Sequence, residues 1–186
     1  MLDIGRFVSD GVGLKITSAI KGMQSVWNEV EGSSAAMPIK LVDPAFSICI
    51  GSSGLTLQQG FGTIAADGLS VTKSCDTYGK VSAWVIEFEP SFIKSIQKGS
   101  SSSFVTSHTD LAIGAAITIN EVIPANCLAL VTGYTARYDN DIAAVSWETA
   151  LLPTSVRFRK SGSDVYDTPV TANWIVIEFV EGVMRV

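Results

Sequence analysis

Short apolar runs rich in Val, Ile, Thr, Phe and Trp follow one another along the chain, separated by clusters of turn residues such as 51–54 and 161–164. Apolar and polar residues alternate with a period of two in 69–73, 116–120 and 155–159, as they do in strands with one buried face. Short strands at close spacing with turn signals between them are typical of antiparallel sandwiches and barrels. The pattern therefore predicts an all-β fold.

Two longer runs, 81–88 and 170–180, are nearly continuous in apolar residues. A strand of this kind is covered on both faces, here either by a second sheet or by another subunit. Glu87 and Glu178 are the only acids inside these runs. Alternation places each glutamate on the face opposite the Ile and Phe beside it, where it can meet solvent or a basic partner. We interpret both as structural rather than catalytic carboxylates.

The two apolar runs also end alike, because Val-Ile-Glu-Phe occurs at 85–88 and again at 176–179. Two upstream landmarks repeat in the same order: Ile20-Lys21-Gly22-Met23-Gln24 matches Ile93-Lys94-Ser95-Ile96-Gln97, and Val42-Asp43-Pro44-Ala45 matches Val122-Ile123-Pro124-Ala125. Matched landmarks in one order indicate an internal duplication. Their separations grow from 73 to 80 to 91 residues, so the second copy carries insertions, which loops between strands tolerate best.

The duplication predicts two tandem antiparallel β-sandwich domains, residues 19–90 and 91–186, after a short N-terminal arm of residues 1–18. The arm lies outside the repeat, and we expect it to dock on a neighbouring subunit, with a frayed tail as the alternative. The apolar residues Ile16, Ile20, Met23, Trp27 and Val30 have a heptad-like spacing that also suits a helix. Because the matching segment 93–97 leads into a Gly/Ser run, we favour a strand over 19–27.

The tryptophans of the two long runs are out of step with the repeat. When Val-Ile-Glu-Phe is aligned, Trp84 matches Ile175 and Trp174 matches Ala83. Side chains alternate between the two faces of a strand, so the two rings are expected on opposite faces, one in its own core and the other at an interface. The sequence does not decide which ring does which. The aromatic residues predicted to contribute to interfaces are Trp84, Trp174, Trp27, Phe88 and Phe179.

The composition adds an expectation about assembly. Hydrophobic residues make up 47% of the 186 residues and charged residues only 17%, and we expect the apolar excess to form buried interfaces of a homo-oligomer, a trimer or a hexamer. No apolar run approaches the roughly 20 residues that span a bilayer, and the first residues lack the apolar centre of a secretory signal. The net charge of −5 and the lack of a basic patch beyond Arg157, Arg159 and Lys160 argue against nucleic-acid binding.

Residues suited to catalysis are sparse. Cys49, Cys75 and Cys127 have no metal-binding spacing, and the single histidine, His108, lies in a Ser/Thr-rich loop. Phosphate-binding, dinucleotide-binding and nucleophile-elbow glycine motifs are missing from the sequence, so we predict no enzyme, no metal and no other cofactor. The best candidates for a ligand-binding loop are aromatic and acidic, namely Tyr134, Tyr138, Asp139 and Asp141.

The second copy resembles β-sandwich modules of bacteriophage virion proteins, especially tail- and fibre-associated ones. The resemblance rests on strand patterns over roughly 93–180: the opening Ile93 to Gly99, the alternating Ala116 to Asn120, Ser155 to Lys160, and the closing Val170 to Phe179. The closing strand, with its Trp174, is also similar to the end of the H-type lectin fold, a six-stranded antiparallel sandwich. Residues 20–89 show the likeness more loosely.

This resemblance implies a structural protein of the virion that is assembled in the host cytoplasm and docks other virion proteins. Two alternatives stay open on the same residues. A lectin-like receptor-binding module would bind a host surface glycan through the loop around Tyr138. A capsid decoration protein would differ only in its position on the particle.

Overall fold

The computed structural model describes residues 19–28, 36–54, 61–74, 80–105, 111–113, 115–135, 146–161 and 169–183. These residues form thirteen β-strands and three short 3-10 helices. Every strand pairing among them is antiparallel. The prediction of an all-β, antiparallel fold is confirmed.

The N-terminal half, up to the end of β6, contains two three-stranded sheets. Its inner sheet has the order β1-β6-β3, and its outer sheet has the order β2-β5-β4. The 3-10 helix η1 (Pro44–Phe46) leads into β3. The strands are β1 (Ile20–Asn28), β2 (Ala36–Pro38), β3 (Ser47–Gly54), β4 (Phe61–Ile64), β5 (Ser70–Ser74) and β6 (Lys80–Phe88).

The C-terminal half begins with η2 (Pro90–Phe92) and repeats this arrangement. Its inner sheet has the order β10-β13-β7, and its outer sheet has the order β11-β12-β8, with β9 also pairing with β12. Helix η3 (Pro124–Asn126) leads into β10 as η1 leads into β3. The strands are β7 (Ile93–Val105), β8 (Leu111–Ile113), β9 (Ile117–Thr118), β10 (Cys127–Thr135), β11 (Ser146–Leu152), β12 (Ser155–Ser161) and β13 (Pro169–Phe179).

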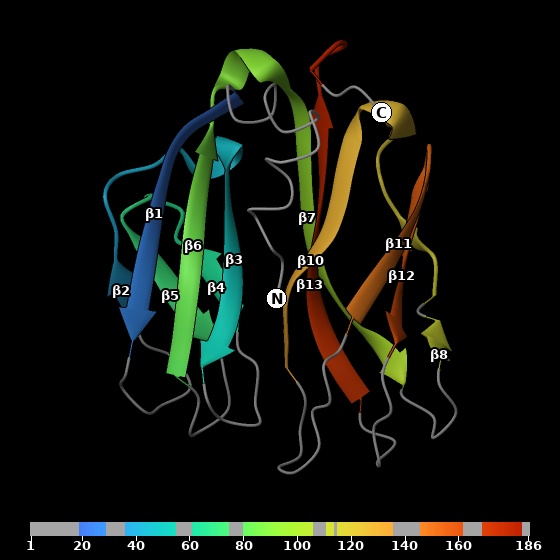
Figure 1. Ribbon diagram of the computed structural model, residues 1–186, viewed down its shortest axis with the longest axis horizontal. Coiled ribbons are helices and arrows are strands. Elements are labelled where there is room, and N and C mark those ends of the chain that lie inside the picture. The colour runs from blue at the N-terminus through green and yellow to red at the C-terminus, as the bar shows by residue number, and fades with distance from the viewer. Residues whose placement is uncertain are drawn as a thin grey trace.

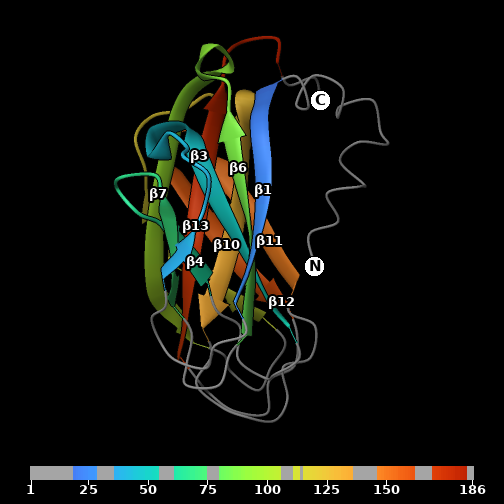
Figure 2. The same ribbon diagram turned by 90° about the vertical axis from the view of Figure 1, so that its left-hand side faces the viewer.

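The sheets pack around three hydrophobic cores in the described part of the chain. The N-terminal core lies between the sheets of the first half and includes Val71 and Val85, while the C-terminal core lies between the sheets of the second half and includes Phe158 and Val176. A central core joins the two inner sheets, which face one another across the middle of the molecule (Figures 1 and 2). The two halves therefore share a core.

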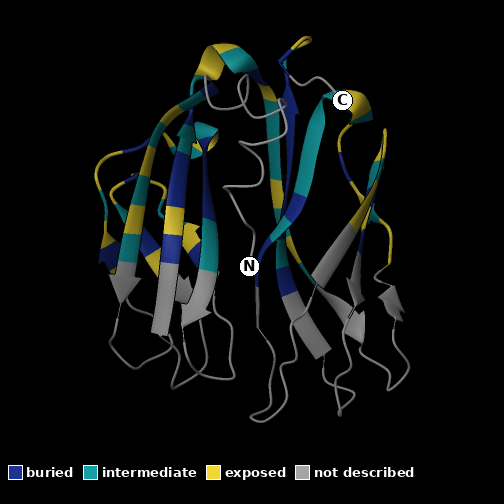
Figure 3. Cartoon of the chain, in the orientation of Figure 1, coloured by how far each residue is buried: buried dark blue, intermediate teal, exposed yellow. Residues whose placement is uncertain are grey.

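Most described residues of the central strand of each inner sheet are buried, on both faces, with the exposed Trp84 of β6 as an exception (Figure 3). This burial explains the nearly continuous apolar sequence of the two strands. In β6, Ala83 and Val85 enter the N-terminal core, and the alternate residue Ile86 enters the central core. In β13, Val176 enters the C-terminal core and Ile177 the central core. The second cover predicted from sequence is thus the other half of the same chain.

Equivalent positions in the two halves make the same hydrogen bonds. The Gln24 side chain donates to the Lys40 carbonyl and accepts from the Lys40 amide, at 2.9 and 2.8 Å. The Gln97 side chain does the same with Asn120, at 3.1 and 2.7 Å. The closing strands match as well, since the Glu89 amide donates to the Ala19 carbonyl and its equivalent Val180 donates to Phe92. The sequence landmarks therefore correspond to matching three-dimensional positions.

Two local predictions have different outcomes. The strand expected over 19–27 is confirmed as β1 from Ile20 onward, where the helical alternative is wrong, while Ala19 itself is helical. The strand expected over 116–120 is shorter, because only Ile117–Thr118 pairs with β12. Beyond it, the amides of Ile119 and Val122 donate to carbonyls of the turn between β11 and β12, which draws the chain out of the ladder.

Candidate functional site

A β-bulge near the start of each half positions a lysine beside a glutamate. Between β1 and β6 the register shifts after Ile20, and between β13 and β7 it shifts at the equivalent place. The extra residues are Lys21 and Lys94, and a bulge of this kind re-aims the side chain of the inserted residue. Lys21 pairs with Glu87 and Lys94 with Glu178, in both cases with 2.9 Å between Nζ and Oε1.

Each glutamate also fixes the loop before a 3-10 helix. Glu87 accepts a hydrogen bond from the amide of Asp43 at 3.1 Å, and Glu178 accepts one from the amide of Ile123 at 3.0 Å. These amides directly precede Pro44 and Pro124, the first residues of η1 and η3. Both carboxylates are therefore engaged in holding backbone.

The two glutamates differ in burial. Glu178 is 1% exposed, so of the two surroundings expected for the glutamates, solvent or a basic partner, it has the basic partner, as Glu87 also does. Burial opposes ionisation of Glu178, but hydrogen bonds from Lys94, Ile123 and Ser95 together outweigh it and lower the pKa of this carboxyl. At the other pair, the hydrogen bond and charge of Glu87 raise the pKa of Lys21.

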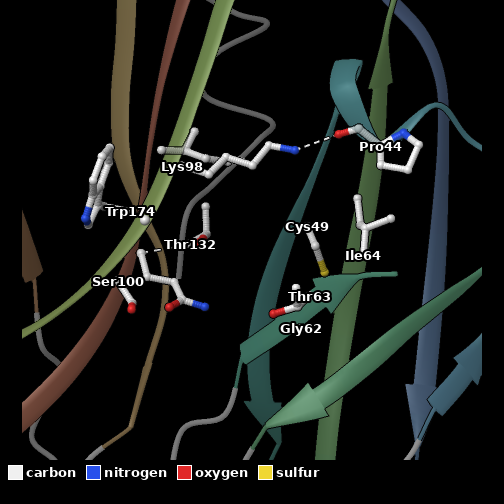
Figure 4. Close-up of a pocket in the computed structure, with 12 residues that line it drawn as sticks. Pro44, Cys49, Gly62, Thr63, Ile64, Lys98, Ser100, Thr132 and Trp174 are labelled. Atoms are coloured by element: carbon white, nitrogen blue, oxygen red, sulfur yellow. Dashed lines mark hydrogen bonds between the residues drawn. The ribbon is translucent and has the colours of Figure 1, made fainter. Parts of the chain in front are cut away.

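A pocket of about 310 Å³ lies at the seam between the halves (Figure 4). Its walls come from β3, β4 and η1 of the N-terminal half and from β7, β10 and β13 of the C-terminal half. The lining includes Cys49, Thr63 and Ile64 on one side and Lys98, Ser100 and Thr132 on the other. The described lining offers no carboxylate or imidazole, and its titratable side chains are Lys98 and Cys49.

Lys98 crosses the seam. Its Nζ donates to the carbonyl of Pro44 at 2.8 Å and to that of Ser47 at 2.5 Å, which ties β7 to the segment entering β3 (Figure 4). Burial of the ammonium lowers the pKa of Lys98, against smaller opposing effects of Cys49 and Asp43. Sequence reasoning missed this residue, although the repeat held a signal: the position equivalent to Lys98 is Ser25.

Cys49 and Cys127, the cysteines within the described residues, have thiols whose pKa is raised. Burial raises the pKa of Cys49 to about 12, against a smaller opposing effect of Lys98. Burial, and then the charge of Glu178, raises the pKa of Cys127 to about 11. The Cys127 thiol also donates to the Ile123 carbonyl, at 3.2 Å. Because the thiolate is the reactive form, both act as small packing groups.

The tryptophan rings lie on opposite faces, as the alignment predicts. Trp174 is buried in the C-terminal core, where its ring packs so closely on Gly99 that a Cβ there would lie 2.4 Å from Cζ2. Its indole Nε1 has no hydrogen-bond partner. Trp84 is 41% exposed and lies on the face of β6 that also carries Ile86 and Phe88.

The other predicted interface residues lie inside the chain or outside the description. Phe88 and Phe179 are buried in the central core, edge to face with ring centroids 6.1 Å apart. They join the two halves of one chain, so little of their surface is left for a second subunit. Trp27 lies in β1, but its side chain is outside the described residues.

The predicted ligand loop is not placed by the structure. Tyr138, Asp139 and Asp141 lie outside the described residues, and of Tyr134 only the backbone, in β10, is described. His108 and Cys75 also lie outside them. The loop stays a prediction from sequence.

Within the residues that the structure describes, no group of three or more His, Cys, Asp or Glu side chains is placed to hold a metal ion. Nor does that part of the chain contain a helix long and apolar enough to cross a membrane. No family model, curated protein or solved structure matches the chain.

Proposed function

We propose that the protein is a structural component of a bacteriophage virion, associated with the tail or its fibres, that docks other virion proteins and has no catalytic role. We further propose that its halves are tandem β-sandwiches that arose by internal duplication, preceded by an arm of residues 1–18. The observation that carries the duplication is the repeated sheet order together with the equivalent hydrogen bonds of Gln24 and Gln97.

The shared central core favours a rigid structural role. Phe88, Ile177 and Phe179 remove large apolar surfaces from water at the junction of the halves. At roughly 25 cal/mol per Å² of buried apolar area, a core of this kind strongly opposes separation of the halves. Two sandwiches held in this way keep a fixed relative position. A structural component of a virion needs such rigidity to hold the proteins bound to it in place.

Docking is supported by exposed apolar side chains that adjoin the same backbone hydrogen bond in each half. In the N-terminal half, Leu41 and Leu69 lie on segments joined by the hydrogen bond from the Val42 amide to the Gly68 carbonyl. In the C-terminal half, Ile123 and Leu152 flank the equivalent bond from Val122 to Pro153. Exposed apolar side chains grouped in this way suit contacts with other proteins, although they do not occupy equivalent positions in the two halves.

These exposed pairs now carry the proposal of a homo-oligomer. The apolar excess of the sequence alone is a weaker argument, because the central core already accounts for part of it within one chain. A trimer or hexamer would use the exposed leucines to bind a second copy, and other virion proteins would use the same surfaces.

The test is to follow the chain through virion purification. We expect it to co-sediment with intact particles at a constant copy number and to be labelled by immunogold on the tail. Labelling on the shell would instead identify a capsid decoration protein, and absence from purified particles would refute a virion role. Leu41→Ser with Leu152→Ser should reduce incorporation while leaving the melting temperature nearly unchanged, because both side chains are exposed.

A further inference from the structure

The ammonium of Lys98 lies at the seam pocket, and within the described residues no carboxylate forms an ion pair with it. Lys21 and Lys94 each pair with a glutamate at 2.9 Å. Lys98 donates instead to the backbone carbonyls of Pro44 and Ser47. Burial lowers the pKa of Lys98, although the residue stays partly exposed, so its surroundings disfavour the charge. A positive charge that is partly removed from water is stabilised by a bound anion.

The other charged or titratable groups near Lys98 do not neutralise it. The carboxylate of Asp43 has the smallest of the effects on Lys98, and it accepts a hydrogen bond from the Ala45 amide at 2.9 Å, at the start of η1. The thiol of Cys49, whose pKa is raised to about 12, is uncharged at neutral pH. The described lining of the pocket therefore carries a single positive charge and no negative one.

The Lys98 ammonium also has hydrogen-bonding capacity left for a ligand. An ammonium has three N–H donors, and the two backbone carbonyls take two of them. Figure 4 shows Lys98 reaching from β7 across the pocket toward Pro44, with Cys49, Thr63 and Ile64 on the opposite wall. The third donor can therefore bind an anion inside the pocket.

The strands beside Lys98 add neutral hydrogen-bonding groups. In the pairing of β7 with β13, Ile175 lies opposite Lys98 and Asn173 lies opposite Ser100. Residues opposite one another and residues two apart share a face, so the Asn173 amide and the Ser100 hydroxyl lie on the Lys98 side of this sheet. Ile175 adds an apolar surface between them, and Thr63 adds a hydroxyl from the other wall. A carbon skeleton that bears hydroxyl groups matches this mixture.

The size and position of the pocket restrict its ligand further. A volume of about 310 Å³ is at the lower end of the range of roughly 300–1,000 Å³ for small-molecule sites, which suits a molecule as large as one monosaccharide. The position equivalent to Lys98 in the first half is Ser25, so the duplication does not repeat the charge. The site is thus created by the way in which the two halves meet.

We propose that the seam pocket binds a small hydroxylated organic acid, whose carboxylate pairs with the Lys98 ammonium and whose hydroxyl groups bond to Ser100 and Asn173. Such a ligand contacts both halves and strengthens the link that Lys98 makes between them. This inference goes beyond the proposed function, because a structural role in the virion does not require a small ligand.

Isothermal titration calorimetry with D-glucuronate and D-glucose at pH 7 and constant ionic strength tests the proposal, because the carboxylate distinguishes the two probes. We expect the unaltered chain to bind glucuronate at least tenfold more tightly than glucose. Lys98→Met keeps an unbranched side chain without the charge and should lose this preference. Lys40→Met, which removes an exposed lysine outside the pocket lining, is the matched control and should keep it.

A second variant is needed because Lys98→Met also removes the two hydrogen bonds across the seam. Ser100→Leu leaves Lys98 in place and fills part of the pocket, so it should weaken glucuronate binding at least tenfold with little change in melting temperature. Absence of glucuronate binding, equal affinity for glucose, or undiminished binding by both pocket variants overturns the proposal. Equally effective competition by sulfate also overturns it, because the site would then be a general anion site.

Discussion

The replacement of Glu178 by Gln is the sharpest test of the lysine–glutamate pairs. Gln keeps the size of the side chain and an acceptor for the Ile123 amide, so the change removes the charge and little else. The carboxylate is 1% exposed and accepts hydrogen bonds from Lys94, Ile123 and Ser95. Hydrogen bonds to a charged group contribute about 1.5–3 kcal/mol each, against about 1 for neutral ones.

The expected loss is smaller than the sum of these differences. The Lys94 side chain is 54% exposed, so its ammonium returns to water when the carboxylate is gone. We expect Glu178→Gln to lower the free energy of unfolding by about 1–2 kcal/mol, or a few degrees of melting temperature for a chain of this length. Glu87→Gln is the matched control, with two donors and a more exposed carboxylate, and should cost about half as much.

The pH dependence has a definite sign. The pKa of Glu178 is lower in the folded protein than its usual value of 4.5, so its contribution to stability is fully present above that pH and is lost as the pH falls through the folded-state pKa. Urea unfolding followed by tryptophan fluorescence should therefore show the gap between Glu178→Gln and the unaltered protein at pH 7, and a narrowing gap below pH 4.5. A loss no greater than that of Glu87→Gln, or a gap unchanged in acid, would falsify the reasoning.

Three further outcomes follow from packing. Gly99→Ala should destabilise the fold by about 1–3 kcal/mol, since its Cβ would lie 2.4 Å from the Trp174 ring; Gly22→Ala, with nothing within 4 Å, should change the urea midpoint little. Phe179→Ala should cost about 3–5 kcal/mol and move one cooperative transition for the whole chain, because its ring lies in the core shared by both halves; two separated calorimetric transitions would contradict the shared core. Cys49 should react with a thiol reagent at pH 8 only after urea unfolding, because burial raises its pKa to about 12; equal native rates for the unaltered protein and Cys49→Ser would bear this out, and a slower rate for the variant would not.

The strand pattern and the repeat were predictable because both are local in sequence. Alternation located β5 and β12, and the matched landmarks anticipated that Gln24 and Gln97 occupy corresponding positions. The opposite faces of Trp84 and Trp174 followed from a one-residue shift against the repeat. A period of two fixes which side chains share a face, and these predictions needed nothing more.

Tertiary packing decides what covers each face of a strand, and the sequence pattern does not predict it. An apolar run such as 81–88 requires two covers, but it does not say whether the second cover is another subunit or the other half of the same chain. Phe88 and Phe179 were assigned to interfaces on this ground, and they lie in the central core. The bridging role of Lys98 depends on how the halves are offset, which no local pattern records.

The β-bulges at Lys21 and Lys94 also affect how readily the protein aggregates through its sheet edges. Strands β1 and β7 lie at the ends of the inner sheets, and an unprotected edge strand is a template on which other chains can polymerise. A bulge twists such an edge, and a lysine on it adds charge that an incoming strand would have to bury. Lys21 and Lys94 are the bulged residues of these edges and also carry the charge, at equivalent positions in the two halves. The residues that neutralise Glu87 and Glu178 thereby protect a strand-rich, apolar chain against aggregation through its open sheet edges.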